Sequence, residues 1–259
     1  MKILKHFAGK SQYQKVFEFL FNIALKGLNY SNGGNFRESG ELYVLKTLAS
    51  KFKSEKKILI FDVGGNVGNY AKTISEVFGE NTSIYSFEPS KVTFEMFQAT
   101  TKGITNITPY NFGFSDSVDE LLLFTDKNGS GLASVYERNL VHFNISMNQS
   151  EKIQLSTIDA FCQSEKIEYI HFLKLDIEGH ELKALIGAKG MLDNGLIETI
   201  QFEFGGCNID SRTYFQDFYY LLNEKYKIYR ILKDGLTEIA NYSEIAEIFT
   251  TANYLAIKR

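Results

Sequence analysis

The chain of 259 residues contains no tryptophan, only two prolines and only two cysteines. Cys162 and Cys207 lie far apart in the sequence, in no C-x-x-C or other metal-binding spacing, so neither a disulfide framework nor a cysteine zinc site is indicated. We expect two reduced thiols in a cytoplasmic protein.

The sequence also lacks long runs of basic residues and long runs of apolar residues. The formal net charge is −3, and the basic cluster of Lys53, Lys56 and Lys57 is short, so no nucleic-acid partner is expected. No signal-peptide pattern is visible, and no apolar run reaches the ~18 residues that a transmembrane helix needs. Residues 11–28 instead predict an amphipathic helix. We expect it to pack against the main domain, and its lysines leave a role at a membrane surface open.

Apolar residues make up 44% of the chain and aromatic residues 14%, which is ample for a buried core. A chain of this length predicts one large α/β domain, or one domain with an extension. We therefore divide it into an N-terminal helical extension, residues 1–55, and a catalytic domain, residues 56–259. A turn cluster at residues 31–35 interrupts the extension.

Strand patterns alternate with helix patterns along the second part. The expected strands are residues 57–62, 83–88, 107–114, 170–175, 196–204, 226–232 and 253–257. This alternation predicts a parallel, doubly wound sheet. The connection before the last strand is too short for a crossover helix, which predicts an antiparallel end. Residues 120–125 and 151–155 fit a hairpin packed on the sheet edge.

The most informative stretch is Ile58–Tyr70, in which an apolar strand ends in Asp62 and a turn of small residues leads into a helix. Such a turn lets a ligand approach the backbone, and the helix start presents unpaired N–H groups. A dinucleotide fingerprint would require glycine at positions 66 and 69, and both are asparagine. The pattern therefore favours a smaller nucleoside ligand, and Asp62 suits a cationic amino group.

Polar residues also stand at the ends of the other strands, where ligands bind in a doubly wound sheet. Glu88 follows Gly68 by 20 residues and could accept two hydrogen bonds from a ribose diol. For several of these residues a purely structural role, as a cap, a turn or a partner of a helix dipole, remains open. The other residues of this set are Asn111, Ser115, Asp116, Asp176, Glu178, His180, Glu181 and Glu203.

Five segments together resemble the motifs of the FkbM family of S-adenosylmethionine-dependent methyltransferases: residues 62–70, 87–89, 111–116, 174–181 and 201–203. The resemblance covers about residues 57–205. It implies an α/β fold with the Rossmann-like class I methyltransferase sheet, in the order 3-2-1-4-5-7-6 with strand 7 antiparallel.

The activity that the resemblance implies is transfer of a methyl group from S-adenosylmethionine to a hydroxyl of a sugar, nucleotide sugar or glycan, with S-adenosylhomocysteine as product. Polysaccharide biosynthesis is the expected setting. Another small metabolite, a lipid-linked acceptor and a non-catalytic nucleotide-binding module are the alternatives. A nicotinamide-dependent oxidoreductase is disfavoured by the missing glycines.

The resemblance also assigns roles to residues. The turn and Asp62 would hold the methionine part of the donor, Glu88 the ribose, and Ser115 or Asp116 the adenine. The expected donor-binding residues are Asp62, Gly64, Gly65, Asn66, Gly68, Tyr70, Glu88, Ser115, Asp116 and Asp176.

Methylation of a hydroxyl requires a base or a metal, because a hydroxyl is a weak nucleophile at neutral pH. His180 is the best base by its intrinsic pKa. Asp176, Glu178 and Glu203 offer a carboxylate base or an oxygen-rich site for Mg²⁺ or Ca²⁺. We favour catalysis without a metal.

Recognition of the acceptor is expected from three segments outside the motifs, residues 30–41, 127–148 and 206–214. Arg37 and Arg212 could each clamp a phosphate with two hydrogen bonds, or form a surface salt bridge. Asn208 is the third expected substrate-binding residue. The N-terminal helices could also pair with a second subunit.

Overall fold

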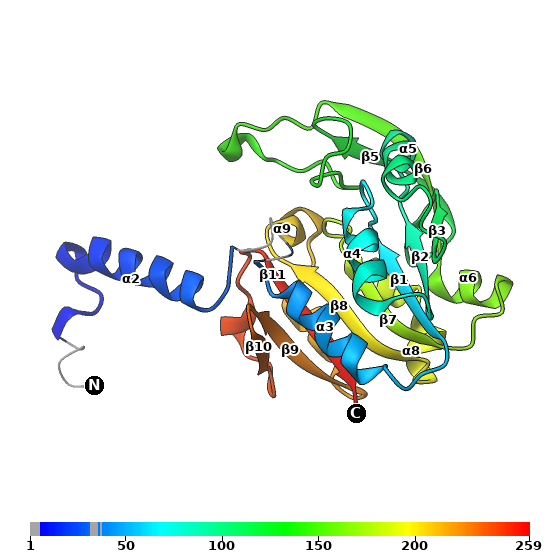
Figure 1. The fold of residues 1–259 in the computed structure, drawn as a ribbon. Helices are drawn as coiled ribbons and strands as arrows, with labels where there is room; N and C mark the ends of the chain where they lie inside the picture. Colours follow the sequence, from blue (N-terminus) through cyan, green and yellow to red (C-terminus); the bar gives the residue numbers. More distant parts are fainter. Residues whose placement is uncertain (1–5, 32–35, 37) are drawn as a thin grey trace.

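The fold is seen in a computed structural model that describes residues 6–31, 36 and 38–259. Its centre is a sheet in the order β10-β9-β11-β8-β7-β1-β2-β3 (Figure 1). The strands are β1 (Ile58–Val63), β2 (Thr82–Phe87), β3 (Ile107–Tyr110), β7 (Ile170–Leu175), β8 (Ile197–Phe204), β9 (Tyr226–Leu232), β10 (Gly235–Glu238) and β11 (Ala252–Lys258).

The strand order confirms the predicted class I pattern. β1, β2, β3, β7 and β8 are parallel, whereas β11 runs antiparallel to both of its neighbours, β8 and β9. In the class I numbering, this is the order 3-2-1-4-5-7-6 with β11 as strand 7. The short strand β10 adds a hairpin partner at the edge of β9.

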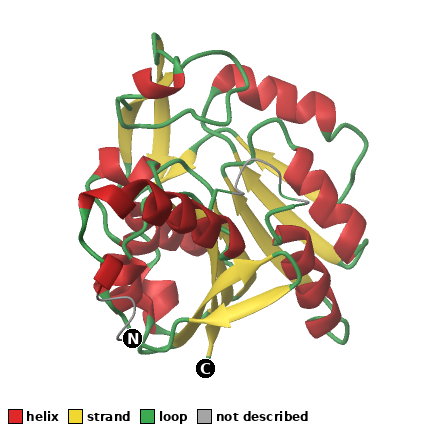
Figure 2. Ribbon diagram, turned by 90° about the vertical axis from the view of Figure 1, so that its left-hand side faces the viewer, coloured by secondary structure: helices red, strands yellow, loops and turns green. Residues whose placement is uncertain are grey.

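Helices cover both faces of the sheet (Figure 2). Ile60 packs in one hydrophobic cluster and its neighbour Phe61 in the other, because successive strand residues point to opposite faces. Helices α3 (Glu41–Lys51), α4 (Asn69–Phe78) and α5 (Lys91–Thr100) cover the Ile60 face. The Phe61 face is covered by α6 (Ile158–Ser164), α7 (Glu181–Ile186), α8 (Lys189–Asp193) and α10 (Phe215–Leu222).

A second, smaller sheet stands apart from the first. It contains β4 (Gly113–Phe114), β5 (Asp119–Thr125) and β6 (Gln149–Ser156), and β5 pairs antiparallel with β6. The expected pairing of these two segments is therefore present. They form a separate sheet that the chain enters directly after the edge strand β3, where β4 pairs with β6 and Phe114 of β4 packs against Phe87 of β2, with ring centres 4.5 Å apart.

The N-terminal helices differ in how they pack. Helix α3 lies on the sheet with Val44, Leu45 and Leu48 buried. Helix α2 (Gln14–Gly27), which follows the short 3-10 helix η1 (Ser11–Tyr13), projects from the body and buries none of its residues (Figure 1). Our expectation that this helix packs against the main domain is wrong. Within the described part of the chain, no helix is long and apolar enough to cross a membrane.

Candidate functional site

Two cavities open at the carboxyl ends of the central strands. The turn cavity lies over the β1–α4 turn and is lined by Gly64, Asn66, Glu88, Pro89 and His180, among others. The loop cavity lies beside it and is lined by Ser31, Leu132, Arg138, Leu140, Phe143, Glu203, Gly206, Cys207, Phe249, Thr250 and Thr251, among others. Gly131, Asp176 and Glu178 line both cavities, so the two meet at the end of β7.

The β1–α4 turn is shaped by its glycines. Gly64 has a φ of +87°, and a Cβ atom there would lie 1.9 Å from the carbonyl oxygen of Asp176. At Gly65 a Cβ atom would lie 2.4 Å from Ser86 Oγ. Side chains are therefore excluded from both positions, and the backbone at Gly64 forms part of the wall of the turn cavity.

Glu88 connects the ends of β1 and β2. Its carboxylate accepts hydrogen bonds from the backbone N–H groups of Asn66 and Ser90, each at 2.9 Å. Burial raises the pKa of Glu88 to about 7. The Asn66 side chain in turn donates to the carbonyl oxygen of Ser130, at 3.0 Å, and so ties the turn to the loop that follows β5.

The far wall of the turn cavity is apolar, and the sequence analysis missed it. It is formed by Phe114 of β4 together with Leu123, Ile153 and Leu155 of the β5–β6 pair. The alternation of residues 151–155, in which Ile153 and Leu155 stand between polar neighbours, was the available signal, since it predicts a strand with one apolar face. An apolar wall opposite a polar turn can take the flat face of a nucleobase.

Asp62 lies beneath the turn and does not line either cavity. It is fully buried, its carboxylate accepts a hydrogen bond from Ser86 at 2.8 Å, and Lys174 Nζ lies 3.9 Å away. Desolvation by burial raises the pKa of Asp62, and the Lys174 ammonium opposes that shift. Lys174 is itself buried and also contacts Asp176, at 3.0 Å. Asp62 of β1 thus interacts with Lys174 of β7 beneath the turn.

Gly65 and Gly68 of the turn line neither cavity, and three further predicted donor-binding residues also stand away from the cavity walls. Tyr70 is buried in the core, with Lys174 Nζ 4.5 Å from its ring centre. Ser115 is buried behind His180, and Asp116 is bound to Lys183 at 2.6 Å, which lowers the pKa of Asp116. The donor-binding roles of these three residues remain predictions.

The β7–α7 turn holds its acids in a strained backbone. Glu178 adopts a φ of +51°, in the left-handed region that few non-glycine residues occupy. The carboxylate of Glu181, a residue with no solvent exposure, accepts hydrogen bonds from the backbone N–H groups of Ile177 and Gly179, at 2.9 and 3.0 Å. Glu181 therefore fixes the turn that presents Glu178 to both cavities.

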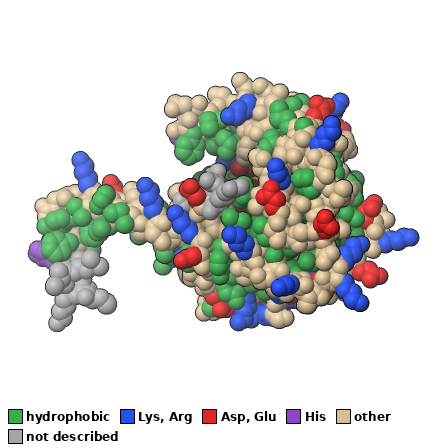
Figure 3. Space-filling view, viewed as in Figure 1, with side chains coloured by type: hydrophobic (Ala, Val, Ile, Leu, Met, Phe, Trp, Pro, Cys, Tyr) green, Lys and Arg blue, Asp and Glu red, His purple; other side chains and the backbone are tan. Residues whose placement is uncertain are grey.

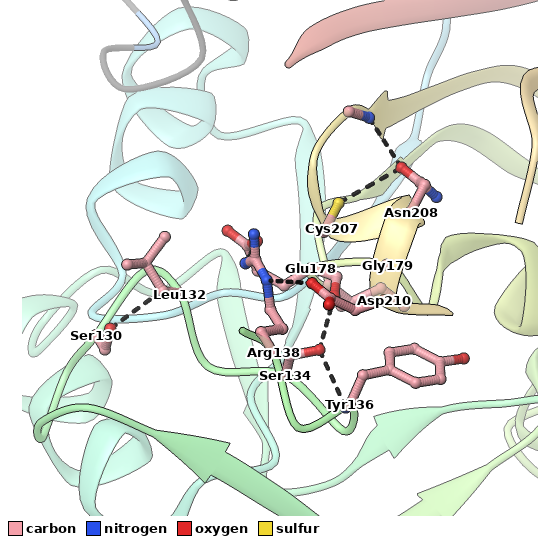
Figure 4. A network of polar contacts seen from close by, with 12 residues as sticks. Ser130, Leu132, Ser134, Tyr136, Arg138, Glu178, Gly179, Cys207, Asn208 and Asp210 are labelled. Atoms are coloured by element: carbon pink, nitrogen blue, oxygen red, sulfur yellow. Dashed lines mark hydrogen bonds and ion pairs between the residues drawn. The ribbon is translucent and has the colours of Figure 1, made fainter. Parts of the chain in front are cut away.

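Arg138 joins the β5–β6 loop to this turn. Its guanidinium donates to the Glu178 carboxylate and lies 3.5 Å from Asp210 (Figure 4). The Ser134 hydroxyl donates to the carbonyl oxygen of Glu178, at 2.8 Å. Burial nevertheless raises the pKa of Glu178 to about 8, with the nearby Asp176 adding to the shift and Arg138 opposing it.

Both ring nitrogens of His180 are engaged in hydrogen bonds. Nδ1 lies 3.0 Å from the Tyr136 hydroxyl, and Nε2 lies 2.9 Å from Ser115 Oγ. Burial lowers the pKa of His180 to about 4, so the ring is neutral at physiological pH. To act as a base, His180 would have to release one of these partners.

Glu203 ends β8 in the loop cavity. Burial and the neighbouring acids Asp176 and Glu178 raise its pKa well above the usual range. Glu178, Glu203 and Cys207 each bring one potential metal-ligating atom within 4.8 Å of the others. Both cysteines of the chain are free and buried.

None of the three predicted substrate-binding residues is seen to line the turn cavity or the loop cavity. Arg37 lies outside the described residues. Asn208 is fully buried, and its side chain accepts from the backbone N–H of Gly205 and donates to Thr213, at 2.8 and 2.7 Å. Arg212 is exposed and lines neither cavity. Arg138, in the predicted 127–148 segment, is the arginine that does line the loop cavity.

The fold and the site together define a class I methyltransferase domain. Its glycine turn and the acid at the end of β2 stand together at the carboxyl edge of the parallel strands, where ligands bind in such sheets, opposite an apolar wall.

Comparison with known proteins identifies the family. The FkbM methyltransferase domain matches residues 62–231, and the chain belongs to this family of S-adenosylmethionine-dependent methyltransferases. A hexuronic acid methyltransferase of Haloferax volcanii is 26% identical over 156 residues, which is 60% of this chain and 59% of that protein. The chain thus matches less than two thirds of that relative's length.

Solved structures are similar to this chain at a lower sequence identity than the Haloferax volcanii relative. The fibrillarin pre-rRNA processing protein of Methanococcus jannaschii has a TM-score of 0.45 and 11% identity, over 86% of this chain and 76% of that one. An S-adenosylmethionine-dependent O-methyltransferase of Thermotoga maritima has a TM-score of 0.41 and 10% identity, over 83% and 64%. The assignment rests on the family match and on the topology, and not on these two structures.

Proposed function

We propose that the protein transfers a methyl group from S-adenosylmethionine to a hydroxyl oxygen of a sugar, nucleotide sugar or glycan, in the biosynthesis of a polysaccharide. The observation that carries this proposal is the junction of the two cavities at Asp176 and Glu178. One cavity suits the donor, the other is open to an acceptor, and acids stand where they meet.

In the turn cavity, the backbone of Gly64–Gly68 would face the methionine part of the donor, and Glu88 would accept hydrogen bonds from the ribose hydroxyls. The wall of Phe114, Leu123 and Leu155 would cover the adenine. When bound, S-adenosylmethionine supplies a methyl group already activated by a sulfonium. The acidic junction favours that positive charge.

Glu178 is the base that this arrangement favours. Its pKa of about 8 places it close to neutrality, where a carboxylate both takes up and releases a proton readily. Arg138 holds the carboxylate in place, and Asp176 stands on the same turn. Burial and the neighbouring acids raise the pKa of Glu203 well above its usual range, which favours the protonated form, and in that form Glu203 could donate a hydrogen bond to the acceptor. His180 would act by positioning Ser115 and Tyr136.

The identity of the acceptor draws on the Haloferax volcanii relative, which is named for a hexuronic acid. A hexuronic acid offers both hydroxyl and carboxylate oxygens. Three acids line the loop cavity, and its arginine is already paired, so a neutral hydroxyl is the better fit. Another small metabolite or a lipid-linked sugar would meet the same requirement.

The test has two stages. Calorimetry with S-adenosylmethionine should show binding to the wild-type chain, and Glu88→Ala should weaken it by at least ~10-fold, since two hydrogen bonds to the ribose are lost. A panel of nucleotide sugars with methyl-labelled donor should then yield a labelled product that resists mild alkali, as an ether does. A product that alkali cleaves would instead identify a methyl ester, and absence of donor binding would point to a non-catalytic module.

A further inference from the structure

Helix α2 carries an apolar face that nothing in the described structure covers. Its side chains are half or more exposed: Val16 55%, Phe19 65%, Leu20 50%, Phe21 59% and Ile23 51%. Figure 3 shows hydrophobic side chains, in green, gathered on the outer part of the projecting arm. An exposed apolar surface of this kind normally marks a contact with a partner or a membrane.

The same helix is positively charged, in contrast to the rest of the chain. Helix α2 itself contains Lys15, Lys26 and a single acid, Glu18, for a formal charge of +1, and Lys10 ahead of it brings residues 6–27 to +2, whereas the whole chain carries −3. At 100° per residue, Lys15 and Lys26 fall within about 40° of Phe19 on the helix surface. Lysines at the margin of an apolar face can extend their ammonium groups toward lipid phosphates while the apolar face is buried.

A second apolar element projects on the same side of the molecule. The 3-10 helix η2 (Val141–Phe143) lies in the loop between β5 and β6, and its Val141 and Phe143 are 71% and 65% exposed. In Figure 1 this loop, in green, and α2, in blue, extend toward the same side. Phe143 also lines the loop cavity.

The base of α2 is fixed at the rim of that cavity. The backbone N–H of Ser31 donates to the carbonyl oxygen of Thr251, at 2.9 Å, and both residues line the loop cavity. Tyr30, the residue before Ser31, is buried, and its hydroxyl accepts a hydrogen bond from the Arg230 guanidinium, at 2.9 Å. These contacts fix the C-terminal end of α2 beside the loop cavity. Any surface to which α2 binds would therefore lie close to the mouth of that cavity.

We propose that α2 docks on the surface of an anionic lipid bilayer and holds the mouth of the loop cavity beside it. A second copy of the chain is the less favoured occupant, because pairing two α2 helices would bring two equal positive charges together. The apolar face also extends from Phe19 round to Phe21, which is wider than the seam of a helix pair and suits burial in an interface. The proposal does not depend on the proposed acceptor.

Flotation with vesicles tests it directly on the full chain. Equimolar phosphatidylcholine and phosphatidylglycerol vesicles should bind the protein, and vesicles of phosphatidylcholine alone should bind it at least ~10-fold more weakly. The double variant Phe19→Asp, Ile23→Asp should lose ~10-fold or more of the binding to anionic vesicles. Because none of the α2 residues is buried, this variant should keep the thermal unfolding midpoint of the wild type.

Charge variants provide the matched control. Lys15→Glu should weaken binding to anionic vesicles by roughly 10-fold, whereas Lys72→Glu, an equally exposed lysine on α4, should change it by less than about twofold. Equal binding to neutral and anionic vesicles, or equal effects of the two lysine variants, would overturn the proposal. A dimer in solution that Phe19→Asp, Ile23→Asp converts to a monomer, with no vesicle binding by the wild type, would assign the face to a second copy instead.

Discussion

The two cavities at the sheet edge are built in different ways. The turn cavity has the backbone of the β1–α4 turn on one side, where Gly64 leaves no space for a side chain, and an apolar wall of side chains from β4, β5 and β6 on the other. The loop cavity is formed by side chains from segments far apart in the sequence, which Arg138 holds together by ion pairs. The first arrangement allows little variation in ligand, whereas the second can change with a few loop residues. This difference agrees with the proposed function, in which the turn cavity binds a constant methyl donor and the loop cavity binds an acceptor that can vary.

The largest expected effect comes from the backbone of the turn cavity. Gly64→Ala should destabilise the fold by at least ~3 kcal/mol and abolish binding of S-adenosylmethionine, because its Cβ atom would lie 1.9 Å from the Asp176 carbonyl oxygen. Gly79→Ala is the matched control. Gly79 also has a positive φ, +77°, with a ψ of −168° that essentially only glycine adopts, but no atom lies within 4 Å of the added Cβ, so backbone strain alone should cost about 1–3 kcal/mol. Thermal unfolding and calorimetry measure both, and equal effects would refute the steric explanation.

The next effect concerns the junction of the cavities. Glu178→Gln should reduce kcat ~100-fold or more while the Kd for the donor stays within about threefold, because a proton acceptor is lost and not a binding group. In the wild type, kcat should rise with pH through about 8, since the base works only when deprotonated. Asp210→Asn, which changes the other acid beside Arg138, should retain most of the activity. A kcat for Glu178→Gln close to that of the wild type would move the base to another residue.

A smaller effect is expected from the ion pairs of the loop cavity. Arg138→Leu should raise the acceptor KM by ~10-fold and leave the donor Kd unchanged, because the β5–β6 loop loses its tie to Glu178. It should also shift the pH profile of kcat to higher pH, since the guanidinium lowers the pKa of Glu178. Arg138→Lys should restore the pH profile. If the donor Kd weakens as much as the acceptor KM, the two cavities are not independent.

The smallest effect is expected from removal of metal. Treatment with EDTA should change kcat by less than about twofold, because the carboxylate base requires no Lewis acid. Added Mg²⁺ should have as little effect. A loss of activity that Mg²⁺ restores would turn Glu178, Glu203 and Cys207 into a metal site, for which their ligating atoms are close enough.

The sequence indicated one side of the turn cavity because the signals for that side are local. Gly64, Asn66 and Glu88 lie within one β-turn-α unit and the strand after it, and regular strand geometry places them together. The parallel sheet followed from the alternation of strands and helices and its antiparallel end from a short connection, whereas the order of the strands was implied by the family resemblance.

The loop cavity was harder to predict because it depends on contacts over long separations. Arg138 and Glu178 are 40 residues apart in the sequence, and no periodic pattern of residues predicts a contact between them. Asn208 was expected to face the substrate, but its amide is used within its own loop, as buried amides commonly are. The exposure of α2 could not be read from its pattern either, since an apolar face indicates burial without indicating what covers it.

The place of β11 in the sheet has a consequence for how the protein is made. β11 is the last strand of the sheet along the chain, yet it lies between β8 and β9. While the polypeptide is still leaving the ribosome, β8 therefore has one unpaired edge and β9 no partner except β10. Those edges are open to association with other nascent chains until Ala252–Lys258 emerges, so chaperones that shield strand edges should matter most in that interval.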